Sequence, residues 1–150
     1  MDRPADLATS LRELAERYFR ALDRADLDAL ARCFTEDAVT VYLGGDWRLT
    51  GRHAIVDRFR AYRRTSGLSS SIHLVGTQAF TVGGAGAAGH VLAIAHLEFA
   101  DRIVVRGLSY DDTYVLVDGS WLIRERRQKP LWQYEISCSP VGLPAGPGRT

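Results

Sequence analysis

Two histidines are candidate chemical groups because each interrupts an apolar segment with the composition of a β-strand. His73 lies near the start of one such segment and His96 in the middle of the next. Imidazole titrates closest to neutral pH of all side chains, so it is a natural proton donor and acceptor. If the turn between the segments closes at Gly84-Ala85, the two histidines face each other across an antiparallel pair. The sequence thus predicts that they share one face of a sheet and act together.

A metal site is the less favoured interpretation of the same histidines. Glu98 shares the face of His96, but no third ligand stands at a convincing spacing, so we expect no metal ion or other cofactor. The two cysteines, Cys33 and Cys138, lie far apart without metal-ligand spacing. A disulfide framework or a structural zinc site is therefore not expected, and Cys33 is expected to be a small buried side chain.

A second polar cluster interrupts the predicted strand at 102–117. Alternation places Tyr110, Asp112 and Tyr114 on one face and Asp111 on the other. One of the two aspartates must therefore face the interior of the fold. A buried carboxyl group needs a partner, and an arginine in the next strand, Arg124 or Arg126, could supply it. Which aspartate faces the interior stays open at this point.

The elements that must position these groups are helices in the first half of the chain and strands in the second. Apolar residues at spacings of three and four predict a helix over 7–22. A short helix follows Asp26, with Phe34 on its inner face. A hairpin is predicted at 38–49 and a third helix from 50 or 51 to about 64. Strands are predicted at 71–82, 88–100, 102–117 and 120–136.

This order of elements is typical of the α+β class, in which helices cover one face of an antiparallel sheet. A long, curved sheet covered in this way would enclose a conical pocket. The 150 residues suit a single domain at 1–139, followed by a Pro- and Gly-rich flexible tail at 140–150.

The composition narrows the classes of function. With 46% hydrophobic and 25% charged residues, the chain is expected to fold rather than to be disordered. The net charge of +1 disfavours a nucleic-acid partner. The arginines of the third predicted helix are expected to form a solvated basic surface. Because no signal peptide or membrane-spanning segment is recognisable, we expect a cytoplasmic protein without a membrane partner.

Several segments resemble the nuclear-transport-factor-2-like cone fold, also called the SnoaL-like superfamily. They lie at 18–23, 26–28, 34–38 and 110–121, within a similarity that spans about residues 7–136. The resemblance implies a cone-shaped α+β barrel with three N-terminal helices packed on a strongly curved, mostly antiparallel mixed sheet. It also implies a homo-oligomer, a dimer or trimer. The superfamily includes dehydratases, isomerases, cyclases, hydrolases and proteins without enzymatic activity.

Within this superfamily the polar residues are most similar to those of scytalone dehydratase-like enzymes. His73 and His96 match the two histidines of that family. Asp23 matches the helix aspartate that orients the second histidine, and Tyr42 matches a tyrosine that activates the substrate carbonyl through water. The resemblance implies a cofactor-independent dehydratase, a lyase acting on a small cyclic or polyketide-like hydroxy-carbonyl compound.

Two departures from that pattern concern substrate contacts, and they indicate a substrate other than scytalone. The family's second tyrosine is Leu22 here, and its substrate-contacting asparagine falls near Tyr110. The ketosteroid isomerase branch is a rival, because Tyr18 matches its oxyanion tyrosine, and Asp111 or Asp112 could match its protonated aspartic acid. However, a tyrosine occupies the position of that branch's essential base.

The predicted mechanism divides two proton transfers between the histidines, with Asp23 fixing the tautomer of His96. Tyr42, helped by Tyr18 or Tyr110, stabilises the enolate oxygen. His53 and His90 are expected to be structural or solvated. The predicted substrate-binding residues are Tyr18, Tyr110, Asp112, Phe59 and Trp121.

Three alternatives remain open for the function of this pocket. It could serve a polyketide-tailoring isomerase or cyclase, or it could bind a small molecule without turnover, in which case the two histidines would be separated or plugged by bulky side chains. A partner-binding transport factor would instead need an exposed apolar patch as its docking surface. The expected partner in the leading interpretation is a small-molecule substrate.

Overall fold

A computed structural model describes residues 4–137 of the protein, with three α-helices and six strands. The predicted tail at 140–150 and Cys138 lie outside the described residues. The helices are α1 (Pro4–Arg24), α2 (Leu27–Ala31) and α3 (Arg52–Thr65), and a 3-10 turn, η1, covers Leu43–Gly45. The strands are β1 (Phe34–Tyr42), β2 (Trp47–Thr50), β3 (Ser70–Gly83), β4 (Gly86–Glu98), β5 (Arg102–Val117) and β6 (Ser120–Ser137).

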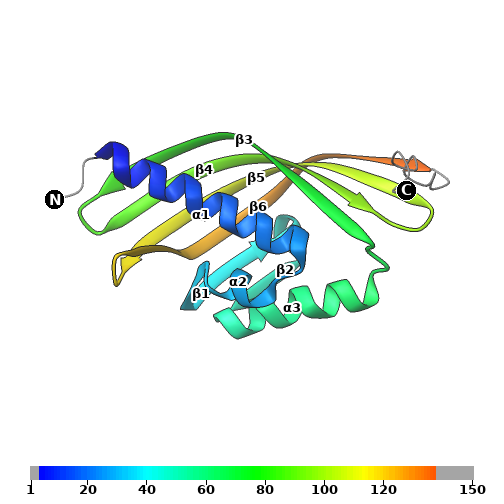
Figure 1. Ribbon diagram of the computed structural model, residues 1–150, viewed down its shortest axis with the longest axis horizontal. Coiled ribbons are helices and arrows are strands. Elements are labelled where there is room, and N and C mark those ends of the chain that lie inside the picture. The colour runs from blue at the N-terminus through cyan, green and yellow to red at the C-terminus, as the bar shows by residue number, and fades with distance from the viewer. Residues whose placement is uncertain (1–3, 138–150) are drawn as a thin grey trace, which may run out of the picture.

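The strands form one mixed sheet in the order β2-β1-β6-β5-β4-β3. Only the β1–β6 pair is parallel among these neighbours; the other pairs are antiparallel. The sheet curls without closing, α1 crosses one of its faces, and α2 and α3 lie beside β1 and β2 (Figure 1). The predicted α+β cone fold is thus confirmed.

The helices bury the faces that the sequence pattern predicts, although α1 begins at Pro4 and not at residue 7. The apolar stripe of α1 is buried, with Leu11, Leu14 and Tyr18 at most 1% exposed. Helix α2 starts after Asp26, whose carboxylate accepts a hydrogen bond of 2.9 Å from the backbone N–H of Ala29. A side chain that accepts this bond satisfies a donor that the first helical turn leaves free.

Phe34 belongs to β1 and not to the second helix, so that prediction is wrong. Its backbone pairs with Ile123 of β6, and the preceding Cys33 carbonyl accepts a hydrogen bond from the N–H of Ile123. The ring of Phe34 is fully buried, and an apolar side chain fits the inner face of a helix as well as the buried face of a strand. The long-range pairing with β6 decides in favour of the strand, because tertiary contacts override local helix propensity.

The hairpin of β3 and β4 closes at Gly84-Ala85, as predicted, with Gly83 paired to Gly86. Its register changes farther from the turn. Between the pairs Gln78–Val91 and Val75–Ala93, β3 contains one residue more than β4. This is a β-bulge, and it displaces the first part of β3 by one position relative to β4.

Gly76 lies in this bulge, where the two strands approach closely. A Cβ atom at this position would lie 3.2 Å from the carbonyl oxygen of Leu92, which is tighter than nine in ten such contacts. A glycine inside a strand often marks a bulge or a close backbone approach. The absence of a side chain at Gly76 therefore permits the shift in register.

The bulge overturns the predicted pairing of the two histidines. His73 pairs with Ala95, and His96 pairs with Ile72. His96 alternates with the buried Ala95 and Leu97, so its side chain lies on the convex face of the sheet, opposite the helices. The prediction that His73 and His96 share a face is wrong because one inserted residue exchanges the faces of a strand.

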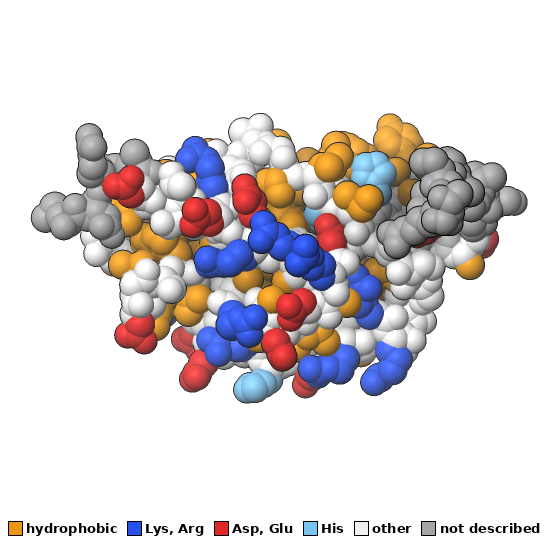
Figure 2. Space-filling view, in the orientation of Figure 1, with side chains coloured by type: hydrophobic (Ala, Val, Ile, Leu, Met, Phe, Trp, Pro, Cys, Tyr) orange, Lys and Arg blue, Asp and Glu red, His pale blue; other side chains and the backbone are white. Residues whose placement is uncertain are grey.

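The basic side chains on the helical side of the molecule are partly structural. Basic side chains gather across the middle of this face, with carboxylates among them (Figure 2). Two arginines of α3 tie it to its neighbours: Arg52 donates to the carbonyl of Phe34, and Arg63 donates to the carbonyl of Leu22. The predicted solvated surface thus includes side chains that position α3. None of the helices in the described part of the chain is long and apolar enough to cross a membrane.

Candidate functional site

A cavity of about 200 Å³ lies between the concave face of the sheet, α1 and α3. Five of the predicted site residues line it: Tyr18, Tyr42, Phe59, His73 and Tyr110. Its floor includes the small side chain of Ala95, and aromatic rings make up much of its wall. The cavity is therefore apolar overall with a few polar groups, as is usual for sites that bind small molecules.

Asp23, near the end of α1, fixes His73 through several hydrogen bonds. Its carboxylate accepts a bond of 2.9 Å from the backbone N–H of His73 and lies 2.6 Å from the ring Nδ1. Ser71 Oγ donates a third bond, of 2.8 Å, to the same carboxylate. The imidazole also stacks on Phe19, with ring centroids 5.3 Å apart, and its side chain is only 8% exposed. These contacts hold the ring in one orientation.

The environment of Asp23 also determines which nitrogen of His73 is free. Burial raises the pKa of this carboxyl group, but the hydrogen bonds from His73 and Ser71 outweigh it and lower the pKa overall. The carboxylate is thus ionised at neutral pH and favours a proton on Nδ1. Nε2 is left available to a molecule in the cavity. The prediction assigned Asp23 to His96, and the bulge explains why it holds His73 instead.

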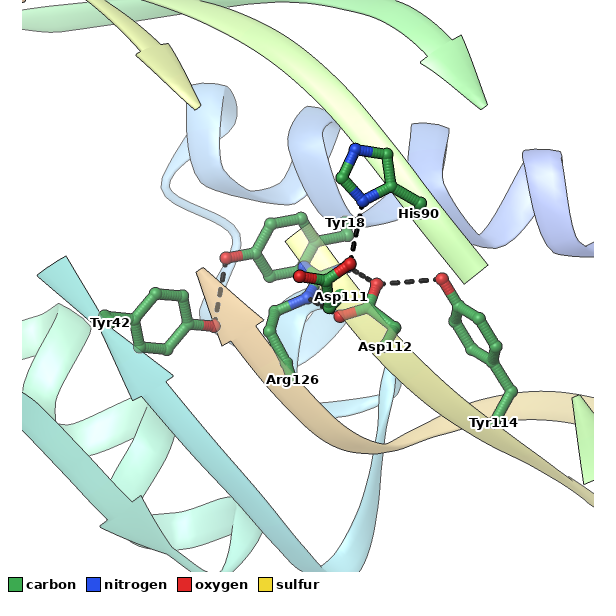
Figure 3. Close-up of polar contacts among 7 residues, drawn as sticks. All are labelled: Tyr18, Tyr42, His90, Asp111, Asp112, Tyr114 and Arg126. Atoms are coloured by element: carbon green, nitrogen blue, oxygen red, sulfur yellow. Dashed lines mark hydrogen bonds and ion pairs between the residues drawn. The ribbon is translucent and has the colours of Figure 1, made fainter. Parts of the chain in front are cut away.

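Tyr18 of α1 and Tyr42 of β1 bring their hydroxyl groups together in the cavity wall. The two oxygens lie 3.0 Å apart, and both side chains are buried (Figure 3). Burial raises the pKa of each, so both hydroxyls are protonated at neutral pH. Whichever hydroxyl donates to the other, one hydrogen remains for an acceptor in the cavity. Burial raises the pKa of Tyr110 as well, so it too keeps its proton.

Asp112 faces the interior, but it binds Arg126 and not the cavity. Arg126 donates two hydrogen bonds to its carboxylate, of 2.8 and 2.6 Å, and Tyr114 donates another of 2.8 Å. The guanidinium carbon of Arg126 also lies 4.0 Å from the ring centroid of Tyr18 (Figure 3). Arg126 is one of the two arginines that were predicted as the partner of the buried aspartate. Asp112, a predicted substrate-binding residue, does not line the cavity, because its oxygens bind Arg126 and Tyr114.

Asp111 points to the opposite face of the sheet. Its carboxylate lies 2.7 Å from Nδ1 of His90, and both side chains are well exposed (Figure 3). His90 therefore lies on the surface, as expected. Trp121 follows the β5–β6 turn and is buried in the core, where it does not line the cavity. Its predicted place in the pocket wall is wrong, because the start of β6 lies away from the site.

Several residues of the cavity were not predicted from the sequence. Alternation along β5 places Arg106 on the same face as Leu108 and Tyr110, so a signal for it was present. Of the others, two lie on α3, one on β2 and one on β6, and their direction toward the cavity depends on how these elements pack. The cavity residues missed in this way include Trp47, Tyr62, Arg63, Arg106 and Gln128. Within residues 4–137, no group of three or more His, Cys, Asp or Glu side chains is arranged to hold a metal ion.

The SnoaL-like domain family matches residues 4–127 of the sequence. The chain therefore belongs to this family, in agreement with the resemblance noted in its motifs and with its fold. Among curated proteins, no match is found.

Solved structures with the same fold include proteins with different assignments. A candidate scytalone dehydratase from Novosphingobium aromaticivorans is 20% identical with a TM-score of 0.77, over 90% of this chain and 93% of that one. A hexachlorocyclohexane dehydrochlorinase, LinA type 2, is 14% identical with a TM-score of 0.80, over 91% and 93%. A candidate dehydratase of the NTF2-like family from Streptomyces avermitilis is 13% identical with a TM-score of 0.75, over 87% and 99%. Identities this low establish a common fold only.

Proposed function

We propose that this protein is a lyase that eliminates water from a small cyclic or polyketide-like hydroxy-carbonyl compound, with His73 as the base. The observation that carries the proposal is the Asp23–His73 pair, fixed at the edge of a cavity that tyrosine hydroxyls also line. A dehydratase and a dehydrochlorinase both remove a proton and a leaving group from neighbouring carbons. Structures with those two names share the fold, which supports an elimination as the class of reaction.

The first step requires a base and a site for the developing negative charge. Nε2 of His73 takes the proton from the carbon next to the carbonyl group, and the electron pair of that C–H bond moves to form an enolate. Asp23 stabilises the resulting imidazolium. A hydrogen bond from Tyr18 or Tyr42 stabilises the enolate oxygen. A positioned base contributes about 10²–10⁴-fold to the rate, and one oxyanion donor about 10²–10³-fold.

The second step expels the hydroxyl group. The enolate electrons form the carbon–carbon double bond as the carbon–oxygen bond breaks, and the departing oxygen takes the proton from the His73 imidazolium. Water leaves, and His73 returns to its starting state. These two steps need only one histidine, so the proposal does not require His96, which lies on the opposite face.

An isomerase is the second candidate, and the same observation favours it. A single base that returns its proton to a different carbon would move a double bond without losing any atom. The two reactions differ in the mass of the product: dehydration removes one water, whereas isomerisation leaves the mass unchanged.

The test is to incubate the protein with a panel of aromatic β-hydroxy ketones and to follow products by mass spectrometry. We expect a product lighter by one water, and a Tyr42→Phe variant slower by about 10²–10³-fold. Tyr134→Phe is the matched control, because Tyr134 is 66% exposed and lies outside the cavity. If no hydroxy ketone loses water, the dehydratase proposal fails; a product of unchanged mass would support the isomerase.

The proposed partner is thus a small molecule, and self-association remains a prediction. The convex face of the sheet exposes apolar side chains of β3, β4 and β6, including Ile72, Ile94 and Trp132. Size-exclusion chromatography with light scattering would distinguish a dimer or trimer from a monomer.

A further inference from the structure

Arg106 lies across the cavity from His73, in the same row of the sheet. The register pairs His73 with Ala95, Ala95 with Arg106, and Arg106 with Gln133. Residues directly opposite one another across neighbouring strands point to the same face. Two strand spacings separate the Cα atoms of His73 and Arg106, a distance of about 10 Å. Ala95, whose side chain is only a methyl group, is the residue between them in this row, and both polar side chains line the same cavity.

The guanidinium group of Arg106 is oriented by an amide and not by a carboxylate. Its Nε donates a hydrogen bond of 2.8 Å to Oε1 of Gln133. No carboxylate among the described residues forms an ion pair with Arg106. The remaining N–H groups of its planar fork are therefore available to a bound molecule, and such a fork matches the two oxygens of a carboxylate.

The other polar groups around the cavity are also donors. Arg63 provides a second guanidinium, which donates to the carbonyl of Leu22. Gln128 accepts a bond from the backbone N–H of Leu43 with its oxygen, and its NH₂ group is a donor that lies against the hydroxyl of Tyr110. The described residues that line the cavity include no aspartate or glutamate. Within a largely aromatic wall, the two arginines are therefore the charged lining residues, and the carboxylate of Asp23 lies behind His73 and Ser71, which it binds.

We infer that this cavity binds a substrate that carries a carboxylate, held by Arg106, with the reacting carbon at His73. The reacting end rests on the proposed function, whereas the carboxylate site depends only on the cavity. Gln133 is the positioning residue that orients the guanidinium. The span between His73 and Arg106 suits a ring or a short chain between the carboxylate and the reacting carbon.

The experiment compares benzoate with benzamide, which has a similar shape but no charge, by isothermal titration calorimetry. We expect the parent protein to bind benzoate at least about tenfold more tightly than benzamide, because a charged hydrogen-bonded pair is replaced by a neutral one. Arg106→Gln should lose this preference by weakening benzoate only. Arg106→Lys should keep part of it, because the charge remains without the planar fork.

Arg127→Gln is the matched control, since Arg127 is exposed on the convex face of the same sheet. The Arg127→Gln variant should prefer benzoate over benzamide as strongly as the parent protein does. No benzoate binding, no preference in the parent, or a preference that survives Arg106→Gln would each overturn the inference. Because the experiment measures binding, its result is independent of turnover: a His73→Ala variant with full activity would refute the proposed function and leave the carboxylate site intact.

Discussion

His73 and His96 belong to the same hairpin and are one position apart in register, yet their surroundings differ completely. His73 faces the helices, stacks on Phe19 and is held by Asp23. His96 faces the convex side, next to Ile72 on β3 and Val105 on β5. Both interrupt apolar strands, so their sequence contexts alone predict the same catalytic role for each. The face on which a side chain lies, and not its residue type, separates a candidate base from a surface residue.

The adjacent residues Asp111 and Asp112 repeat this comparison on β5. Asp112 is fully buried against Arg126, whereas the side chain of Asp111 is 65% exposed and pairs with His90 at the surface. A buried ion pair is costly to break, because removing one partner leaves the other charged and desolvated. A surface pair contributes little, because water and salt screen it. Loss of an aspartate should therefore cost much more stability on the buried face of the sheet than on the exposed face.

The largest expected difference is between the activities of the two variants in which one histidine is replaced. His73→Ala should lower turnover of a hydroxy ketone by about 10²–10⁴-fold, because it removes the proposed base. His96→Ala should remain within about twofold, because its side chain does not reach the cavity. Initial rates for both variants test this directly. Equal losses would contradict the assignment of His73, and a loss confined to His96→Ala would reverse it.

The two aspartates should differ in stability. Asp112→Ala should lower the free energy of unfolding by about 3–5 kcal/mol, since Arg126 would remain charged and buried without its partner. Asp111→Ala should lower it by about 1 kcal/mol or less. Urea unfolding at neutral pH measures both changes. Similar values for the two variants would show that the buried pair is not the stabilising contact inferred here.

The hydrogen bonds of Asp23 should make a smaller, pH-dependent contribution. Because they lower its pKa in the folded protein, their stabilisation is present above the unfolded-state pKa, near 4, and is lost as the pH falls through the folded-state value. Asp23→Asn should therefore be less stable than the parent at pH 5 and lose less stability between about pH 5 and pH 3. Chemical unfolding at these two pH values gives the comparison. An unchanged difference between the proteins would argue against the lowered pKa.

The smallest expected effect concerns the bulge that separates the two histidines in register. Gly76→Ala should destabilise the protein by about 1 kcal/mol, because the new Cβ would press on the carbonyl oxygen of Leu92. Gly83→Ala is the control, because a Cβ there meets no atom within 4 Å. It should leave stability unchanged or raise it slightly. Thermal unfolding of both variants would show whether the close approach at Gly76 matters.

The sequence predicted the order of elements more reliably than the direction of individual side chains. Long alternating patterns defined β3 to β6, and the glycines at 83–86 defined the hairpin turn. The direction of His73 also depends on a single extra residue at 76–77, which hydrophobic patterns do not count. Gly76 carried a signal for the bulge, as a glycine inside a strand. The sequence predicted that one of two aspartates pairs with one of two arginines. Alternation requires one inward aspartate, but it selects neither that aspartate nor its partner.

The bulge at 76–77 also affects how this chain should be aligned with its relatives. A relative without the extra residue needs a gap at that point for its strand positions to correspond to those of β3. A gap placed before Ser71 would instead match the relative's cavity-facing side chains to Ile72 and Leu74, which are exposed on the convex face. Residue-by-residue transfer of site positions across this strand is therefore meaningful only when the inserted residue is located first.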